Sequence, residues 1–422
     1  MAELSGDRAA AGRARAKAGA FNPCGEGGRS VTAVLLNYNS PAETMFRCLD
    51  SLREQTHEDF RVLLVDNASS VDILGEVAER YPEVELLRLD RNYGFSGGIN
   101  RGVAACDSEY VFLLNFDTVV EPECVAEMVK VAAAEPVVVG VAPKIMLSHH
   151  PHIFDSIGTA LGPDAGAFNQ GIGQPDIGQY DRVEPVFGSC FGATLLRRCA
   201  FREDQVGPLD ESYFMYFEDF DWCYRANLLK LEFRTAPAAV VHHEHSASVK
   251  DKGYNFKYRL IERNLLRTVI KNYQRRQMVK IPLRRLRSHL LNAIAPRSGR
   301  AGVSWRIIGG FFTDFFRFLP KRWAVQRRRL VRDDDILAHS FGEEPYFSPT
   351  EYCPIYSLDT LVAAYRRLYA VSGGERALDI YKGLEALNQS KARGDRVLVE
   401  ERLGRLLAGE PEHVRDFAAK IG

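Results

Sequence analysis

YVFLLNFDTVVEP, residues 110–122, is the stretch that decides the fold. Its first five residues are all apolar or aromatic, a pattern typical of a strand buried on both faces in a parallel sheet. The run ends abruptly at Asn115, and Asp117 follows. Ligands of open parallel sheets bind beyond the carboxyl ends of the strands, and divalent cations prefer hard oxygen ligands. The stretch therefore predicts a core strand that carries Asp117 to a binding site, with an ordinary polar turn as the alternative.

Strand and helix patterns alternate on both sides of this core strand. Apolar runs predict strands at 31–38, 60–66 and 84–89 before it, and at 137–142 and 189–198 beyond it. Helical patterns or turns separate these strands, and a Gly-rich turn opens the helix that precedes the core strand. Alternation at this spacing predicts an α/β fold with a mostly parallel sheet.

The remaining segments carry weaker patterns. Residues 148–184 are rich in Gly, Pro, Asp and Gln and are predicted as a long loop over the site. Residues 231–248 are predicted as two short strands that lead to a His-rich turn. From Tyr254 the pattern is helical almost to the end. Residues 1–29 are Ala-, Arg- and Gly-rich without an apolar core, so they are predicted as a disordered tail and not as a secretory signal.

The composition excludes several classes of protein. The 422 residues leave room for one large domain and a second, smaller one. Lys+Arg and Asp+Glu both number 55, so the net charge is zero and indicates no nucleic acid partner. The eight cysteines are scattered without C-x-x-C pairs, which is typical of reduced, cytosolic thiols. No apolar run reaches the ~20 residues that a membrane span requires.

The stretch MYFEDFDWCYRA, residues 215–226, gathers carboxylates among aromatic residues. Glu218, Asp219 and Asp221 lie close together at the start of a predicted helix. Partial burial among aromatic rings raises the pKa of a carboxylate toward that of a general base. The alternative is that these acids complement the dipole of the first helical turn.

Three further groups have the chemistry of a binding site. Asp66 ends a predicted strand, and its carboxylate can accept a hydrogen bond from the imide N–H of uracil or thymine; a helix N-cap region is the alternative. The Gly-rich run at 94–102 allows backbone N–H groups to approach a diphosphate at a helix N-terminus. His242, His243 and His245 follow a strand-like run and indicate a ligand to metal or phosphate.

Six motifs occur together in a fixed order: VTAVLLNYN, VDNASS, RNYGFSGGINRG, LLNFDT, MYFEDFDWCYR and AVVHHEHSAS. Through them the chain resembles inverting glycosyltransferase family 2 over about residues 31–273, most closely its bacterial rhamnosyltransferase-like and galactofuranosyltransferase-like members. The resemblance implies a GT-A fold, which is a single nucleotide-binding α/β domain, here predicted over residues 30–273.

The resemblance also implies roles for the candidate residues. It makes Asp219 the catalytic base, with Glu218 beside it, and it makes Asp117 a metal ligand as the last residue of a D-x-D-type motif. His243 is the implied second contact to metal or diphosphate, and His242 fits the same motif within one residue. The implied cofactor is a divalent cation, Mg²⁺ or Mn²⁺. The implied nucleotide-sugar contacts are Asn39, Asp66, Asn67, Gly97, Gly98, Asn100, Arg101 and Asn115, the last at a position where many relatives have Asp.

The activity implied by the resemblance is transfer of a sugar from dTDP-rhamnose or a UDP-sugar to a saccharide acceptor, by direct displacement with inversion. Relatives commonly extend lipid-linked saccharides at the cytoplasmic face of the membrane. The resemblance therefore implies a lipid-linked acceptor, a role in cell-surface polysaccharide or glycan synthesis, and a cytoplasmic enzyme peripheral to the inner face of the cell membrane. Asp66 does not separate uracil from thymine, because both bases present the same imide edge.

Two other functions fit parts of the sequence. A catalytically inactive nucleotide-sugar-binding protein would have the same fold, but retention of both Asp117 and Asp219 argues against it. GFSGG matches the G-x-S-x-G pattern of serine hydrolases, and Ser96, Asp219 and His243 follow their order. However, a nucleophile elbow needs a strand that runs straight into the serine, and here the predicted strand ends several residues earlier.

The carboxyl-terminal third is predicted to be helical and locally basic. Residues 271–330 contain sixteen Lys or Arg and one acid, Asp314. A predicted helix at 307–323 places Ile308, Phe311, Phe312, Phe315 and Leu319 on one face. Basic amphipathic helices over 274–345 are therefore predicted to contact an anionic membrane surface, with ordinary packing on the catalytic domain as the alternative. Residues 346–422 are predicted as a further helical region.

Overall fold

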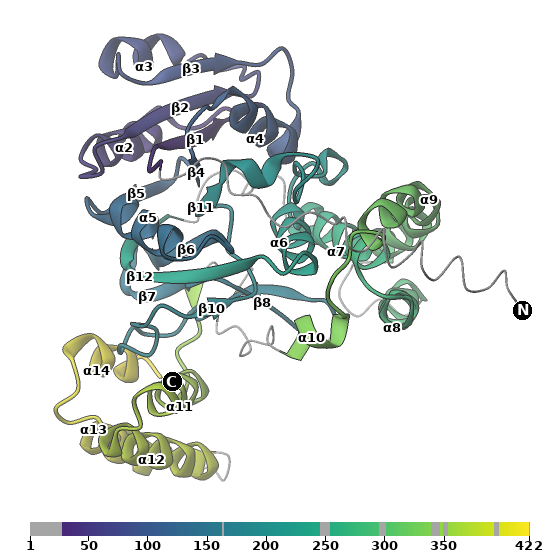
Figure 1. The fold of residues 1–422 in the computed structure, drawn as a ribbon. Helices are drawn as coiled ribbons and strands as arrows, with labels where there is room; N and C mark the ends of the chain where they lie inside the picture. Colours follow the sequence, from purple (N-terminus) through teal and green to yellow (C-terminus); the bar gives the residue numbers. More distant parts are fainter. Residues whose placement is uncertain are drawn as a thin grey trace, which may run out of the picture.

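The computed structural model describes most of the chain, namely residues 28–162, 164–244, 254–294, 301–338, 347–348, 353–391 and 396–421. Residues 1–27 of the predicted tail, and His245 of the predicted His cluster, lie outside these ranges. One large sheet with helices on both faces dominates the structure, and two groups of helices lie beside it (Figure 1).

Four parallel strands form one half of the sheet. β1 (Val31–Asn37) lies between β4 (Tyr110–Leu114) and β2 (Phe60–Asp66), and β3 (Glu85–Arg88) pairs with the outer side of β2. The strand order therefore reverses between β1 and β4, which is where ligands bind in open α/β sheets. This half confirms the α/β class and the predicted core strand at 110–114.

The other half of the sheet is mixed. β11 (Ala193–Arg197) runs antiparallel between β4 and β6 (Val138–Leu147), and β12 (Glu232–His243) pairs parallel with β6. β10 (Pro185–Val186) and β5 (Thr118–Val120) pair antiparallel with β12.

The side chains of β4 alternate between two apolar cores, as expected for a strand with period two. Val111 and Leu113 join the core that includes residues of α4 (Gly94–Ala105) and α6 (Glu218–Leu228). The other three residues of β4 join the core on the opposite face, under α2 (Ala42–Arg53), α3 (Leu74–Arg80) and α5 (Cys124–Ala134). Burial on both faces makes β4 a rigid support for the residues that follow it.

Two sequence predictions about the second half of the sheet are wrong. The predicted loop at 148–184 contains β7 (His150–Ser156), β8 (Thr159–Leu161) and β9 (Ala167–Asn169), and β7 pairs antiparallel with β6. The two short strands predicted at 231–248 are a single strand, β12, whose register shifts between Ala236 and Val240. Such an irregularity bends a strand without ending it, so His242 and His243 lie on the strand and not in a turn.

The helical part of the chain forms two groups on different sides of the sheet (Figure 1). The first contains α7 (Tyr254–Asn272), α8 (Arg275–Ile294) and α9 (Ala301–Gln326), followed by α10 (Asp333–Ala338). The second contains α11 (Leu358–Ser372), α12 (Glu375–Lys391), α13 (Arg396–Leu406) and α14 (Glu412–Ala419). In the chain, the two groups are separated by the short strands β13 (Phe347–Ser348) and β14 (Cys353–Pro354), which pair with each other.

The second helical group has an apolar core of its own, which also takes in Leu147 of β6 and Ile153 of β7. Polar contacts add to this packing: His413 lies 2.7 Å from the carbonyl oxygen of Asp176, and Arg367 donates to the carbonyl oxygen of Gln179 at 3.1 Å. The helical prediction for residues 346–422 is confirmed, whereas the predicted domain boundaries stay a prediction.

Candidate active site

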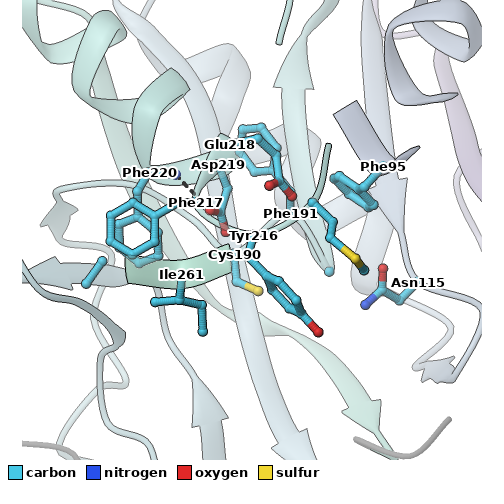
Figure 2. Close-up of a pocket in the computed structure, with 13 residues that line it drawn as sticks. Phe95, Asn115, Cys190, Phe191, Tyr216, Phe217, Glu218, Asp219, Phe220 and Ile261 are labelled. Carbon is cyan, nitrogen blue, oxygen red and sulfur yellow. Dashed lines mark hydrogen bonds between the residues drawn. The ribbon is translucent and has the colours of Figure 1, made fainter. Parts of the chain in front are cut away.

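A cavity of about 310 Å³ lies between the carboxyl end of β4 and the amino end of α6 (Figure 2). It is lined by Phe95, Asn115, Ala167, Cys190, Phe191, Gly192, Met215, Tyr216, Phe217, Glu218, Asp219, Phe220 and Ile261. Three of the predicted site residues, Asn115, Glu218 and Asp219, therefore face one space. Its walls are otherwise mostly apolar, which strengthens electrostatic interactions inside it.

The loop before α6 has an unusual backbone conformation. Phe214, Tyr216 and Phe217 have φ angles of 65°, 66° and 72°, a region that residues other than glycine rarely adopt. Such conformations cost about 1–3 kcal/mol each and persist only where surrounding contacts fix them. Here the Asn264 side chain of α7 donates to three carbonyl oxygens of residues 213–216 at 2.8–3.0 Å. The strained loop is therefore fixed by α7, and it sets where α6 and its carboxylates begin.

Glu218 and Asp219 occupy the first turn of α6, and both have raised pKa values. Burial raises the pKa of Asp219 to about 6, although backbone N–H groups, including that of Phe220 at 2.8 Å, lower it in part. Burial and the neighbouring charge of Asp219 raise the pKa of Glu218 well above its usual value. Its Oε2 atom is buried and has no hydrogen-bond partner among the described residues. Ionisation of the pair therefore favours Asp219 over Glu218.

A second acidic group forms where β5 pairs with β12. Asp117 directly precedes β5, and the register of this antiparallel pair sets Thr118 opposite His243. The Nε2 atom of His243 lies 3.4 Å from Oδ1 of Asp117, and its Nδ1 atom lies 2.6 Å from Oδ2 of Asp155. Burial lowers the pKa of His243, but hydrogen bonds to the two carboxylates and their charges outweigh it and raise the pKa to about 10. The group is thus an imidazole between two carboxylates that attract a positive charge.

The chemistry of Asp117 and His243 fits a divalent cation. Carboxylate oxygen and imidazole nitrogen are common ligands, and a metal-bound histidine usually has its second ring nitrogen held by a carboxylate, as Asp155 does here. Within the described ranges, no cluster of three or more His, Cys, Asp or Glu has the geometry of a complete metal site. Any cation here would therefore need further ligands from a bound diphosphate or from water.

His242 faces away from Asp117, since adjacent residues of a strand point to opposite faces. Its Nε2 atom lies 3.0 Å from Oε1 of Glu121. Of the two histidines that the sequence left open, His243 is the one beside Asp117. Asp155 is a site residue that the sequence analysis missed, because its segment was predicted as a loop.

Asp66, Asn67 and Asn39 lie near the carboxyl ends of β1 and β2. The Oδ1 atom of Asp66 accepts a hydrogen bond from the side chain of Asn37 at 2.8 Å, a second residue that sequence reasoning missed. The Asn67 side chain accepts from the backbone N–H of Tyr93 at 2.9 Å and so fixes the entry to α4. Asn39, with a φ of 55°, accepts from two backbone N–H groups of the loop after β2. These residues shape one edge of the sheet, but none of them lines the cavity of Figure 2.

The Gly-rich helix α4 packs unusually close to the sheet. A Cβ atom on Gly98 would lie 2.4 Å from a methyl group of Leu36, so only glycine fits there without a shift. Gly97 is similarly close to Tyr93. Asn100 pairs with the backbone of Leu209 through both of its amide atoms, at 2.9 and 2.8 Å. These contacts serve the fold, and a role toward a diphosphate stays a prediction for each of them.

Arg101 lies on α4 and is engaged on two sides. Its Nη1 atom forms an ion pair with Glu211 at 2.9 Å, and its guanidinium stacks 3.4 Å from the ring centre of Tyr93. The structure therefore does not bring Arg101 into the cavity with Asp219.

Ser96 does not have the setting of a catalytic nucleophile. It is fully buried within α4, and its hydroxyl has no hydrogen-bond partner among the described residues. His243, the base that a hydrolase would need, is engaged with Asp117 and Asp155. The serine hydrolase alternative is therefore unsupported.

Residues 32–198 match the family model described as Glycosyl transferase family 2. The predicted family resemblance is thereby confirmed.

The relatives agree with this assignment. The chain is similar to the N-acetylglucosaminyl-diphospho-decaprenol L-rhamnosyltransferase of Mycobacterium tuberculosis, at 29% identity over 50% of this chain and 76% of the relative. It is also similar to the low-salt glycan biosynthesis hexosyltransferase Agl10 of Haloferax volcanii, at 24% identity over 46% of this chain and 61% of the relative.

Among solved structures, GalNAc-T7 with UDP, GalNAc and Mn²⁺ is similar, with a TM-score of 0.51 and 14% sequence identity. The match covers 70% of this chain and 57% of the GalNAc-T7 chain. At this identity the similarity concerns the fold alone, and it agrees with the predicted GT-A architecture. Within the described residues, no helix has the length and apolar character needed to cross a bilayer.

Proposed function

We propose that this enzyme transfers a sugar from a nucleoside-diphosphate sugar to a hydroxyl group of a saccharide acceptor, with inversion at the anomeric carbon. The donor would be dTDP-rhamnose or a UDP-sugar. The observation that carries the proposal is Asp219, a carboxylate at the cavity whose pKa of about 6 leaves it ionised at neutral pH. A general base acts best when its pKa lies near the working pH.

In the proposed reaction, Asp219 takes the proton from the acceptor hydroxyl as that oxygen attacks the anomeric carbon. The bond from this carbon to the donor diphosphate breaks as the new glycosidic bond forms, so the configuration inverts and no covalent enzyme intermediate is needed. Burial and the charge of Asp219 disfavour a second negative charge, on Glu218, beside the attacking oxygen. The strained loop held by Asn264 keeps Asp219 in position before substrate arrives.

Asp117 and His243 would hold a divalent cation, Mg²⁺ or Mn²⁺, with Asp155 orienting the imidazole. When bound, such a cation neutralises charge that builds on the departing diphosphate. The Mn²⁺ and UDP named for the GalNAc-T7 structure support this part of the proposal. Asp66, at the edge of the sheet where β1 and β2 end, would accept a hydrogen bond from the imide of the nucleotide base.

The acceptor is proposed to be lipid-linked, and the work of the enzyme to be cell-surface polysaccharide synthesis at the inner face of the cell membrane. The name of the M. tuberculosis relative specifies a diphospho-decaprenol acceptor. A further relative, the amylovoran biosynthesis glycosyltransferase AmsB of Erwinia amylovora, is 23% identical over 60% of this chain and 84% of its own length. Both names support a lipid-linked or polymeric saccharide as the product.

The decisive experiment is a donor screen. Release of nucleoside diphosphate would be measured from UDP-, dTDP- and GDP-sugars, each with Mg²⁺, Mn²⁺ or EDTA. We expect turnover with a UDP- or dTDP-sugar in the presence of metal, because uracil and thymine both present an imide N–H from which Asp66 would accept a hydrogen bond. Tight nucleotide-sugar binding without any turnover, in the presence of a saccharide acceptor, would instead favour the inactive binding protein.

The pH profile offers a separate test. Because Asp219 must be ionised to accept a proton, kcat/KM is expected to fall about tenfold per pH unit below about pH 6 and to level off above it. The measurement is the initial rate between about pH 5 and 8 with saturating metal. A profile that stays flat through pH 6 would remove Asp219 as the base.

A further inference from the structure

Helix α9 carries an exposed apolar stripe that the fold leaves uncovered. Its large side chains are Trp305, Phe312, Phe316, Leu319 and Trp323, and we call this stripe the aromatic ridge. Trp305, Phe316 and Trp323 are exposed by 52%, 71% and 66%. Successive spacings of seven, four, three and four residues set all five on one side of the helix. Exposure of so many large apolar groups in one row marks an interaction surface.

The opposite side of α9 packs on the protein. Phe318 is fully buried in the core next to α6 and α7, and Phe311 and Phe315 pack against that core. The predicted membrane face is therefore corrected: of its aromatic residues, Phe312 is exposed, while Phe311 and Phe315 serve packing. Both sides of α9 are apolar, so periodicity alone did not separate the packed side from the exposed one.

Charge around the aromatic ridge is of one sign. Arg306 and Arg317 each follow a ridge residue by one position and so flank it along the helix, and both are exposed. Neither forms an ion pair with a residue in the described part of the chain. Arg327 stacks on the ring of Trp323, with its guanidinium 4.5 Å from the ring centre.

The acid of α9 does not offset this charge. Asp314 is 2% exposed and is held on the packed side by two bidentate partners, Arg263 and Arg267, at 2.6–3.0 Å. Helix α8, which packs against α9, also has exposed apolar side chains, Leu283, Leu291 and Ile294. The surface is thus apolar, basic and free of exposed acids along α9.

We propose that the aromatic ridge, with Arg306, Arg317 and Arg327, docks on an anionic lipid bilayer. Tryptophan and phenylalanine side chains insert at the boundary between headgroups and acyl chains, and arginines beside them meet lipid phosphates. A second copy of this chain is a poorer occupant, because two ridges face to face would set Arg against Arg.

The position of the ridge suits the proposed lipid-linked acceptor, on which this inference builds. Ile261 of α7 lines the cavity, and α7 packs directly on α9. Docking through α9 would therefore hold the cavity close to the bilayer that carries the acceptor.

The test is flotation of the full-length protein with vesicles of phosphatidylcholine alone or mixed with phosphatidylglycerol, at low and high salt. We expect binding to the anionic vesicles only, weakened by salt because charge attraction is screened. The variant Trp305→Ser/Phe312→Ser/Phe316→Ser/Trp323→Ser should lower the bound fraction at least about tenfold. The variant Arg306→Ala/Arg317→Ala should abolish the preference for anionic lipid.

Val183→Ser/Ile355→Ser is the matched control, because these two side chains are exposed away from α9 and should leave binding unchanged. Circular dichroism verifies that each variant is folded. Equal binding to neutral and anionic vesicles, or no binding by wild type, would overturn the proposal. So would a dimer in light scattering that the ridge variant abolishes. Vesicle binding needs no sugar transfer, so its outcome is independent of the proposed activity, and the ridge variant should retain donor turnover with a water-soluble acceptor.

Discussion

Asp219→Asn is expected to lower kcat by about a hundred- to ten-thousandfold, the usual contribution of a positioned general base. The substitution keeps the size of the side chain but removes the carboxylate that takes the proton from the hydroxyl group of the acceptor. Nucleotide-sugar affinity should change little, because the base acts on the acceptor hydroxyl and not on the donor. Single-turnover rates and calorimetric donor binding would measure the two effects separately.

Glu218→Gln is the matched control for this variant. Because burial and the charge of Asp219 raise the pKa of Glu218 and favour its uncharged form, a neutral amide of the same shape should preserve kcat within about tenfold. If Glu218→Gln were the more damaging change, the role of base would move by one residue. If donor affinity fell in parallel with turnover in Asp219→Asn, the residue would serve binding and not proton transfer.

Asp117→Ala is expected to abolish the stimulation of activity by Mg²⁺ or Mn²⁺ and to lower turnover about a hundredfold or more, as when one electrostatic stabiliser of a transition state is removed. The physical reason is that β4 and β5 hold this carboxylate rigidly beside His243, so no other side chain replaces it. Rates would be measured over a titration of metal against EDTA. Undiminished wild-type activity in EDTA would rule out the metal role.

Asp155→Asn tests the residue that orients His243 in the same site. It should weaken metal affinity by about 10–100-fold while leaving turnover near normal at saturating metal, because Asp155 orients His243 through Nδ1 and would not itself touch the cation. Mn²⁺ binding followed by electron paramagnetic resonance, without substrate, separates this effect from catalysis. Equal affinity in wild type and variant would reduce Asp155 to a structural partner.

The part of the fold that could be predicted from sequence is the part where local pattern and burial agree. The strands at 31–37, 60–66 and 110–114 are continuous apolar runs with a polar residue at the end, and the structure reproduces them closely. β7 does not have a continuous apolar run, because His150, His152 and Asp155 interrupt it. Pairing with β6 makes it a strand, and no local pattern reports that pairing.

The site shows the same division. The acids of 218–221 were recognisable because carboxylates among aromatics are costly unless they are used. By contrast, the contact of Asp117 with His243 depends on antiparallel pairing between segments far apart in the chain. The left-handed backbone of Phe214, Tyr216 and Phe217 runs against local preference. It is fixed by hydrogen bonds from distant parts of the chain, from the side chain of Asn264 and from the backbone N–H of Ser96.

The buried ion pair between Asp314 and Arg267 has a consequence for which acceptors are reached. Arg267 joins α9 to α7 and also donates to the carbonyl oxygen of Ser212 at 2.7 Å, just before the strained loop. No flexible linker intervenes between the aromatic ridge and Asp219. With the ridge on a bilayer, the distance between the lipid surface and the cavity would be fixed. Acceptors whose terminal sugar lies at that distance from the bilayer would be extended. The terminal sugar of a shorter or longer acceptor would not reach Asp219.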